Sequence, residues 1–168
     1  MEFMVTALIF AGGAGRRMNT RSKPKQFLEM HGKPIIIYTL EHFEYHPQVD
    51  RIVVVCLEDW IEELKGLLKR YGITKVCDIM PGGETGHDSI YCGLEAMKVY
   101  TAQADIVLIH DGVRPLINEE LITKNIEAVK QYGNAITAEA VRESVVRSED
   151  GKYISEVPLR DQMYVAKA

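Results

Sequence analysis

The chain has 168 residues, of which 46% are apolar and 26% are charged, and its formal net charge is −4 at pH 7. This apolar content can build one substantial core, so we expect a single domain spanning residues 1–168. The acidic balance argues against binding to nucleic acid through bulk positive charge, and no apolar run approaches the ~20 residues that span a membrane. The N-terminus lacks the charged start and long apolar run of a signal peptide, so we expect a cytoplasmic protein.

Apolar strands and amphipathic helices alternate along the chain. Continuous apolar runs predict buried strands, whereas apolar residues three or four positions apart predict helices. Pro34 suits a first helical turn, Gly72 a helix end, and Asn118 an N-cap with Leu121 facing inward. The predicted elements are strand 5–12, helix 33–46, strand 50–57, helix 58–72, strand 75–79, helix 86–100, strand 104–111, helix 118–133 and strand 134–141.

This alternation predicts an α/β fold in which a mostly parallel sheet is covered by helices on both faces. Ligands of such sheets bind beyond the carboxyl ends of the strands. Three polar clusters stand at predicted strand ends, and their sequences are GGAGRR from Gly12, GGETGHDS from Gly82 and HDGVRP from His110. Because the carboxyl ends of parallel strands share one edge, we expect the three clusters to form one site.

The C-terminal part of the chain has a different pattern. Residues 143–158, ESVVRSEDGKYISEVP, read as two short strands on either side of the turn signal SEDG. The segment holds too few apolar residues for a core of its own. We therefore expect a β-arm over residues 139–160 that projects from the domain.

Two histidines, His42 and His46, stand four positions apart in EHFEYH. That spacing can hold zinc, but Phe43 replaces the glutamate of the metalloprotease motif HExxH. A solvated helix end is the interpretation we favour.

Three glycines, Gly12, Gly13 and Gly15, directly follow the first predicted strand. Glycines let the backbone turn tightly and bring bare N–H groups close to an anion. Cationic side chains surround them, namely those of Arg16, Arg17, Lys23 and Lys25. We interpret the stretch as a loop that binds a triphosphate, and a plain strand-to-helix turn with solvated cations is the alternative.

Two familiar phosphate loops fit this stretch poorly. A P-loop requires Gly-Lys-Ser/Thr, which does not occur in the sequence. The dinucleotide fingerprint G-x-G-x-x-G fits Gly13 and Gly15 but meets Met18 at its third glycine. A nicotinamide-dependent reductase would also need an acidic residue after the second strand, and Glu58 and Asp59 keep that alternative open.

Asp111 ends a strand whose central residues, 106–109, are Ile, Val and Leu. A carboxylate is costly to bury there unless it has a partner. One interpretation is a Mg²⁺ ligand, because hard cations favour carboxylate and phosphate oxygens. The alternatives are a cap for the following turn or an ion pair with Arg114.

Five short motifs follow one another along the chain: AGGAGRRM (11–18), KPKQF (23–27), GGETGHDS (82–89), HDGVRP (110–115) and LRDQMY (159–164). As a set they resemble the cytidylyltransferases that act on 2-C-methyl-D-erythritol 4-phosphate or D-ribitol 5-phosphate, within the sugar-nucleotidyltransferase superfamily. The resemblance implies a Rossmann-like nucleotidyltransferase fold and transfer of CMP from CTP to a polyol phosphate. It further implies a divalent cation, Mg²⁺, and a homodimer formed through the β-arm.

The resemblance also implies roles for individual residues. Arg160 would reach into the site of the second subunit to bind the acceptor phosphate. The implied residues are Arg17, Lys25 and Arg16 for catalysis; Ala11, Gly12, Gly13, Ala14, Gly15, Gly82, Gly83, Glu84 and Ser89 for the nucleotide; Arg114, Ser144 and Arg160 for the acceptor; and Asp111 for the metal.

The sequence departs from the family pattern at some positions. Thr85, Gly86 and His87 occupy a stretch where many relatives carry an arginine, which removes one positive charge, and we expect His87 to be solvated. A late family lysine lies beyond this chain, which therefore looks shortened, and a nucleotide-binding fragment without catalysis is an alternative function. The acceptor is left open, although the stretch 53–72 looks closer to the ribitol branch.

Overall fold

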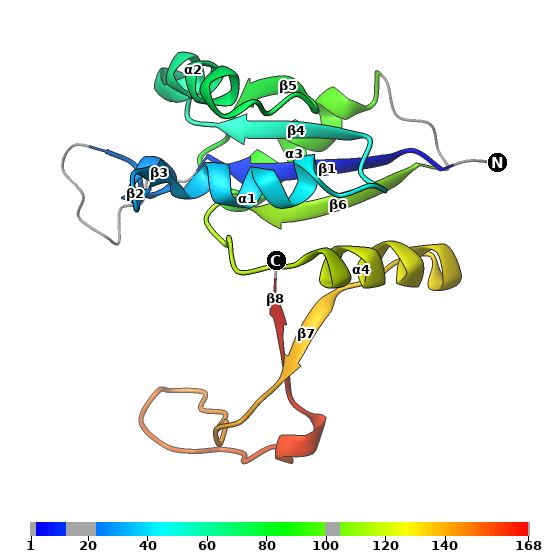
Figure 1. The fold of residues 1–168 in the computed structure, drawn as a ribbon. Coiled ribbons are helices and arrows are strands. Elements are labelled where there is room, and N and C mark those ends of the chain that lie inside the picture. The colour runs from blue at the N-terminus through cyan, green and yellow to red at the C-terminus, as the bar shows by residue number, and fades with distance from the viewer. Residues whose placement is uncertain (1–2, 13–22, 100–104, 168) are drawn as a thin grey trace.

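The computed structural model describes residues 3–12, 23–99 and 105–167, and it shows a four-stranded parallel sheet in the order β5-β4-β1-β6 (Figure 1). The strands are β1 (Val5–Ala11), β4 (Arg51–Cys56), β5 (Val76–Pro81) and β6 (Ile106–Asp111). The chain runs outward from β1 to β5, then crosses to the other side of β1 to form β6. The predicted α/β class is confirmed.

In the described part of the chain, four α-helices follow strands or connect them, as the apolar spacing predicts. They are α1 (Ile35–Glu44), α2 (Ile61–Tyr71), α3 (Gly86–Met97) and α4 (Glu119–Tyr132). Gly72 ends α2 in the left-handed region at φ 68°, and the Asn118 side chain caps α4 by accepting a hydrogen bond from Leu121 N. Both predicted helix boundaries are confirmed.

The strands bury side chains on both faces of the sheet. Ala7, Ile9 and Val54 point into a cluster that also holds apolar side chains of α1, α2 and α4. Leu8 and Val55, from alternate positions on the same strands, pack instead against α3. Since successive side chains of a strand point to opposite faces, the two clusters show that helices cover both sides of the sheet.

Short elements lie between and after these. They are the hairpin strands β2 (Glu29–Met30) and β3 (Lys33–Pro34), the 3-10 turns η2 (Lys25–Phe27), η3 (Glu58–Trp60) and η4 (Arg160–Gln162), and the strands β7 (Thr137–Ala140) and β8 (Tyr164–Lys167). The helix predicted from residue 33 begins two residues later, because Lys33 and Pro34 pair with β2. Pro34 is therefore the residue before the helix and not part of its first turn.

The C-terminal segment leaves the sheet, as Figure 1 shows below α4. The strand predicted at 134–141 is shorter, and it pairs antiparallel with β8 rather than joining the parallel sheet. The prediction of two short strands around SEDG is wrong. The structure has one isolated bridge there, between Arg147 and Glu156, around a bend in which Asp150 accepts hydrogen bonds from two backbone amides. We call residues 137–167 the arm.

The prediction of a solvated helix end at His46 is also wrong. The residue is 1% exposed, its Nε2 lies 3.0 Å from Thr123 Oγ1, and its Nδ1 accepts a hydrogen bond from Gln48 N. His42, one turn earlier, is half-buried and contacts the loop after β6. Among the described residues, no helix has both the length and the apolarity to cross a membrane.

Candidate active site

The strand register places the three polar clusters along one edge of the sheet. Ala11 stands opposite Cys56, Cys56 stands opposite Pro81, and Phe10 stands opposite Asp111. The residues that follow these strand ends therefore emerge side by side. This is the edge where ligands bind in parallel α/β sheets.

Gly12 and Gly82 contact each other directly across this edge. A Cβ built on Gly12 would lie 2.7 Å from Ser89 Oγ and 3.3 Å from Gly82 Cα, and a Cβ on Gly82 would lie 2.8 Å from the same hydroxyl. Real Cβ contacts are essentially never closer than 3.0 Å, so neither position has room for a side chain. The first two polar clusters thus meet at Gly12 and Gly82, as predicted, and only glycine backbone fits at this contact.

The segment that carries Gly82 is held by the start of α3. Thr85 and Asp88 form a reciprocal capping box, in which Thr85 Oγ1 accepts from Asp88 N at 3.1 Å and Asp88 Oδ2 accepts from Thr85 N at 3.1 Å. The hydrogen bonds from the Thr85 side chain and backbone lower the pKa of Asp88. Ser89 is buried and donates to Thr85 O at 2.9 Å. Gly83 lies against this cap, whereas Glu84 and His87 are exposed.

The third cluster joins the same edge through Gly112. Its amide donates to Phe10 O at 3.0 Å, and a Cβ on Gly112 would lie 3.0 Å from Ala11 Cβ. Asp111 Oδ1 accepts from Val113 N at 3.1 Å, and Arg114 Nε lies 3.4 Å from Asp111 Oδ2. The Asp111 side chain is 20% exposed and that of Arg114 is 54% exposed, so both remain accessible from this edge.

The sequence allows Asp111 to be a metal ligand, a cap for the following turn or an ion-pair partner of Arg114. The structure shows both the cap, through Val113 N, and the ion pair. Neither excludes a cation, because an ionised carboxylate has about four acceptor positions. Within the described residues, no group of three or more His, Cys, Asp and Glu side chains could hold a metal. A cation at Asp111 would therefore need phosphate oxygens of a ligand to complete its coordination.

Lys25 is placed beside the end of β1 by its neighbours in η2. Gln26 is fully buried and its Nε2 donates to Ala11 O at 2.6 Å. Phe27 is also buried and stacks on Trp60, with ring centroids 4.7 Å apart. Sequence reasoning assigned no role to Gln26, because a buried amide that reaches a distant carbonyl leaves no periodic signal.

The remaining predicted site residues fall into two groups. Gly13, Ala14, Gly15, Arg16 and Arg17 lie outside the described residues. Ser144 and Arg160 lie on the arm, where Arg160 Nη2 donates to Ser144 Oγ at 3.4 Å. The structure brings these two acceptor candidates together, but on a segment that projects away from the sheet edge (Figure 1).

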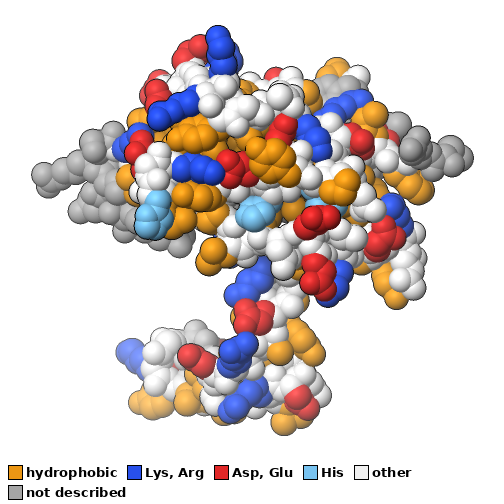
Figure 2. Space-filling model, viewed as in Figure 1, with side chains coloured by type: hydrophobic (Ala, Val, Ile, Leu, Met, Phe, Trp, Pro, Cys, Tyr) orange, Lys and Arg blue, Asp and Glu red, His pale blue; other side chains and the backbone are white. Residues whose placement is uncertain are grey.

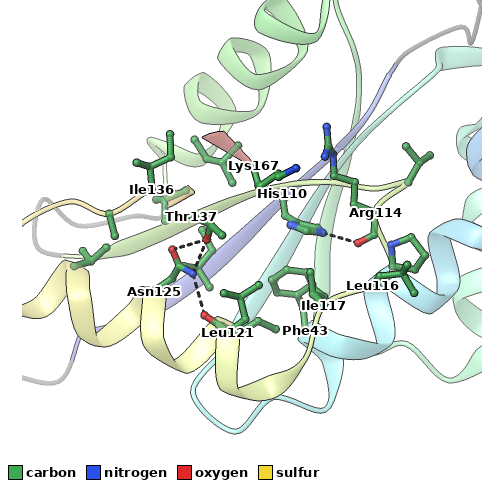
Figure 3. A pocket seen from close by; sticks show the side chains of 18 residues that line it. Phe43, His110, Arg114, Leu116, Ile117, Leu121, Asn125, Ile136, Thr137 and Lys167 are labelled. Atoms are coloured by element: carbon green, nitrogen blue, oxygen red, sulfur yellow. Dashed lines mark hydrogen bonds between the residues drawn. The ribbon is translucent and has the colours of Figure 1, made fainter. Parts of the chain in front are cut away.

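An apolar cavity of about 710 Å³ lies between β6, α4 and the start of the arm (Figure 3). Its wall includes Phe43, His110 and Arg114, but not Gly12, Gly82 or Ser89. In Figure 3 the Arg114 side chain extends away from Phe43, while the carbonyl of Arg114 faces the His110 ring. The loop after β6 therefore forms part of the cavity wall, and the cavity does not include the contact between Gly12 and Gly82.

A parallel sheet with glycine-bearing loops at its carboxyl edge defines an α/β protein of the Rossmann-like nucleotidyltransferase class. The family described as IspD, 2-C-methyl-D-erythritol 4-phosphate cytidylyltransferase, matches residues 5–168, and the chain belongs to this family.

Three relatives illustrate the relationship. A ribitol-5-phosphate cytidylyltransferase from Streptococcus agalactiae serotype Ia is 51% identical over 165 residues, which cover 98% of this chain and 69% of the relative. A 2-C-methyl-D-erythritol 4-phosphate cytidylyltransferase from Clostridium botulinum (strain 657 / Type Ba4) is 37% identical, covering 96% of this chain and 69% of the relative. The crystal structure of 4-diphosphocytidyl-2C-methyl-D-erythritol synthase from Anaerococcus prevotii has a TM-score of 0.80 at 27% identity, covering 100% and 70% of the two chains.

Proposed function

We propose that this protein is a cytidylyltransferase that transfers CMP from CTP to D-ribitol 5-phosphate and releases pyrophosphate. One observation carries the proposal: the family's separate sequence motifs meet at the sheet edge, where Gly82 lies against Gly12 and Gly112 lies against Ala11. The relative named for ribitol 5-phosphate is 51% identical, against 37% for the one named for methylerythritol phosphate. That difference favours ribitol 5-phosphate as acceptor, with methylerythritol phosphate as the second candidate.

The proposed reaction requires no nucleophile from the protein. An oxygen of the acceptor phosphate attacks the α-phosphorus of CTP, a new P–O bond forms, and the bond to the departing pyrophosphate breaks in line. Catalysis then consists of positioning and of neutralising the charge that develops. Backbone amides of 12–17 hold the triphosphate, and Arg17 and Lys25, assisted by Arg16, neutralise it.

The edge offers different surfaces to the two substrates. Gly82, Gly83 and Ser89, with Glu84 beside them, are the proposed contacts of the cytosine, because a small site lined by backbone groups suits a pyrimidine better than a purine. Arg114 binds the acceptor phosphate, because a guanidinium matches phosphate oxygens in geometry and charge. Ser144 and Arg160 contribute to the acceptor site from the arm of a second subunit.

Asp111 fits the role of a Mg²⁺ ligand, since its carboxylate is accessible at this edge and keeps acceptor positions unused. A bound Mg²⁺ would neutralise charge on the triphosphate. Asp111 itself keeps the 111–114 turn closed through Val113 N and holds the Arg114 side chain near the edge.

The test measures pyrophosphate release from CTP with each polyol phosphate in turn. We expect turnover with D-ribitol 5-phosphate, and a loss of about 10²–10³-fold in kcat for both Arg17→Ala and Lys25→Ala, since each removes a charge that stabilises the transition state. Circular dichroism checks that both variants fold. Near-normal turnover in both variants would remove their assignment. CTP binding by calorimetry without turnover on either acceptor would indicate a nucleotide-binding protein that does not catalyse this reaction.

A further inference from the structure

Three side chains from outside the loop 111–115 donate hydrogen bonds to its carbonyls. Thr39 Oγ1 donates to Gly112 O at 3.0 Å, His42 Nε2 lies 2.9 Å from Pro115 O, and His110 Nε2 lies 3.0 Å from Arg114 O. A carbonyl oxygen only accepts, so each imidazole must carry its proton on Nε2. All three contacts therefore join a side-chain donor to the loop backbone.

These donors stand on a rigid support. Thr39 and His42 are one turn apart on the same face of α1, and Thr39 is fully buried. Phe43, the next residue on that face, packs against the His110 ring with centroids 5.3 Å apart. The side chains thus have little freedom to follow the loop if it moves, and the loop is fixed relative to α1.

The loop amides are also engaged. Gly112 N donates to Phe10 O and Arg114 N donates to Asp111 O, each at 3.0 Å. With amides and carbonyls both bonded, the backbone of 111–115 is defined. The exposed guanidinium of Arg114 is then the part that remains available to a ligand.

We propose that Thr39, His42 and His110 are positioning residues, which fix the loop 111–115 so that Arg114 meets the acceptor phosphate in the correct geometry. The inference rests on the proposed function, because it assigns these residues to the acceptor half of that site. A guanidinium–phosphate contact depends on alignment, and a small displacement of its backbone weakens it. The contact between Gly12 and Gly82, where CTP is proposed to bind, has no bond to these donors, and Asp111 is held separately by its pairing with Phe10 in the sheet. The affinity for CTP should therefore change much less than the affinity for the acceptor.

The experiment compares variants that lose one donor with variants that keep it. Thr39→Val and His42→Phe remove the donor at similar volume, whereas Thr39→Ser and His42→Gln retain one. In Thr39→Val and His42→Phe we expect the KM for D-ribitol 5-phosphate to rise about tenfold, which corresponds to weakening one charged hydrogen bond between Arg114 and the phosphate. The KM for CTP should stay within about twofold of wild type. The second pair should restore the acceptor KM.

Thr123→Val is the matched control. It removes one hydroxyl that also bonds to a histidine, His46, which follows the end of α1. No hydrogen bond from the Thr123 side chain to the loop 111–115 occurs among the described residues. The control should leave both KM values unchanged. An unchanged acceptor KM in Thr39→Val and His42→Phe would overturn the inference. An equal rise in the KM values of both substrates, together with a lower melting temperature, would overturn it as well.

Amide hydrogen exchange gives a readout that does not require turnover. Exchange at residues 112–114 should be faster in Thr39→Val and His42→Phe than in wild type or Thr123→Val. If the wild-type protein is inactive with both polyol phosphates, the proposed function fails, and this measurement still decides whether the donors hold the loop. Unchanged exchange in both donor variants would overturn the positioning role independently.

Discussion

Gly82 is a residue at which the site tolerates little change, because its Cα lies against Gly12 and its missing side chain leaves room for Ser89. The requirement is one of space and not of backbone conformation. Gly82 is absent from the glycines of the described residues that have positive φ, so an alanine could adopt its backbone angles. Its Cβ, however, would lie 3.2 Å from Gly12 Cα as well as against the Ser89 hydroxyl.

We predict that Gly82→Ala weakens CTP binding by at least about tenfold, because the backbone of 82–83 or of Gly12 must shift to admit the methyl group. Calorimetric titration with CTP measures the change. Gly66→Ala is the control: Gly66 lies inside α2, exposed, with open space around its Cβ position. It should bind CTP normally and raise the free energy of unfolding by about 0.5–1 kcal/mol. Equal CTP affinity in the two variants would contradict the role of the glycine contact.

The glycine motifs could be predicted to meet because strand ends of a parallel sheet share an edge, a rule that needs only the order of elements. The donors Thr39, His42 and Gln26 could not be found in that way. Each bonds to a carbonyl that is distant in the sequence or on another element, and hydrogen bonds of single polar residues produce no repeat in the sequence. The burial of His46 was missed for the same reason, since its partner Thr123 lies on α4.

At the scale of elements, the last residue of α1 ties this helix to the two residues that precede β5. Glu44 is 8% exposed and accepts hydrogen bonds from Thr74 N at 2.9 Å, Thr74 Oγ1 at 2.6 Å and Lys75 N at 2.8 Å. Desolvation by burial is the largest single effect and raises the pKa, but the hydrogen bonds from Thr74 and Lys75 together outweigh it and lower the pKa of Glu44.

We predict that Glu44→Gln lowers the free energy of unfolding at pH 7 by about 1–3 kcal/mol, the cost of weakening buried hydrogen bonds to a charged group. Because the pKa is lower in the folded state, the stabilisation is present above the unfolded pKa near 4.5 and is lost as pH falls through the folded pKa. The difference between wild type and variant should therefore shrink in acid. Urea unfolding at several pH values measures it.

Glu63→Gln provides the comparison, because Glu63 is exposed on α2. Its effect should stay within about 0.5 kcal/mol at every pH. If the free energies of unfolding of wild type and Glu44→Gln differ by the same amount from pH 7 to acid, the lost hydrogen bonds do not depend on the charge of Glu44.

Elements with a strong apolar pattern were predictable, and elements without one were not. Strands β1 and β4 are nearly continuous apolar runs, since both of their faces are buried, and the existence of all four strands of the parallel sheet was predicted correctly. Strands β7 and β8 are largely exposed and pair only with each other, so no apolar alternation marks their register. The hairpin that displaces the start of α1 consists of two-residue strands, too short to produce a pattern.

At the scale of the whole molecule, the arm presents more apolar surface than it buries. Figure 2 shows hydrophobic side chains on the arm, set apart from the body of the protein. Its exposed large apolar residues are Val146, Tyr153, Ile154, Val157, Leu159, Tyr164 and Val165. Exposed apolar surface of this extent is typical of an interaction site. It supports the proposed homodimer, in which a second copy covers the arm through a two-fold interface.

We predict that the protein sediments as a dimer and that Ile154→Glu with Leu159→Glu shifts it to monomer, because a dimer would bury these side chains and their replacements are charged. Sedimentation velocity measures the shift. Both substitutions lie on the arm and outside the sheet, so circular dichroism should remain unchanged. A wild-type monomer at all concentrations tested would contradict the proposed role of the arm.

A mixing experiment decides whether Arg160 acts across the dimer. If the arm of one subunit completes the site of the other, Arg160→Ala and Lys25→Ala are each inactive alone, yet a mixed dimer contains one site with both residues intact. Random exchange makes half of the dimers mixed, so equal amounts should recover about a quarter of the wild-type sites. If Arg160 instead serves its own subunit, every site in the mixture lacks one of the two residues and no activity returns. The two arrangements thus give different results in one assay of pyrophosphate release.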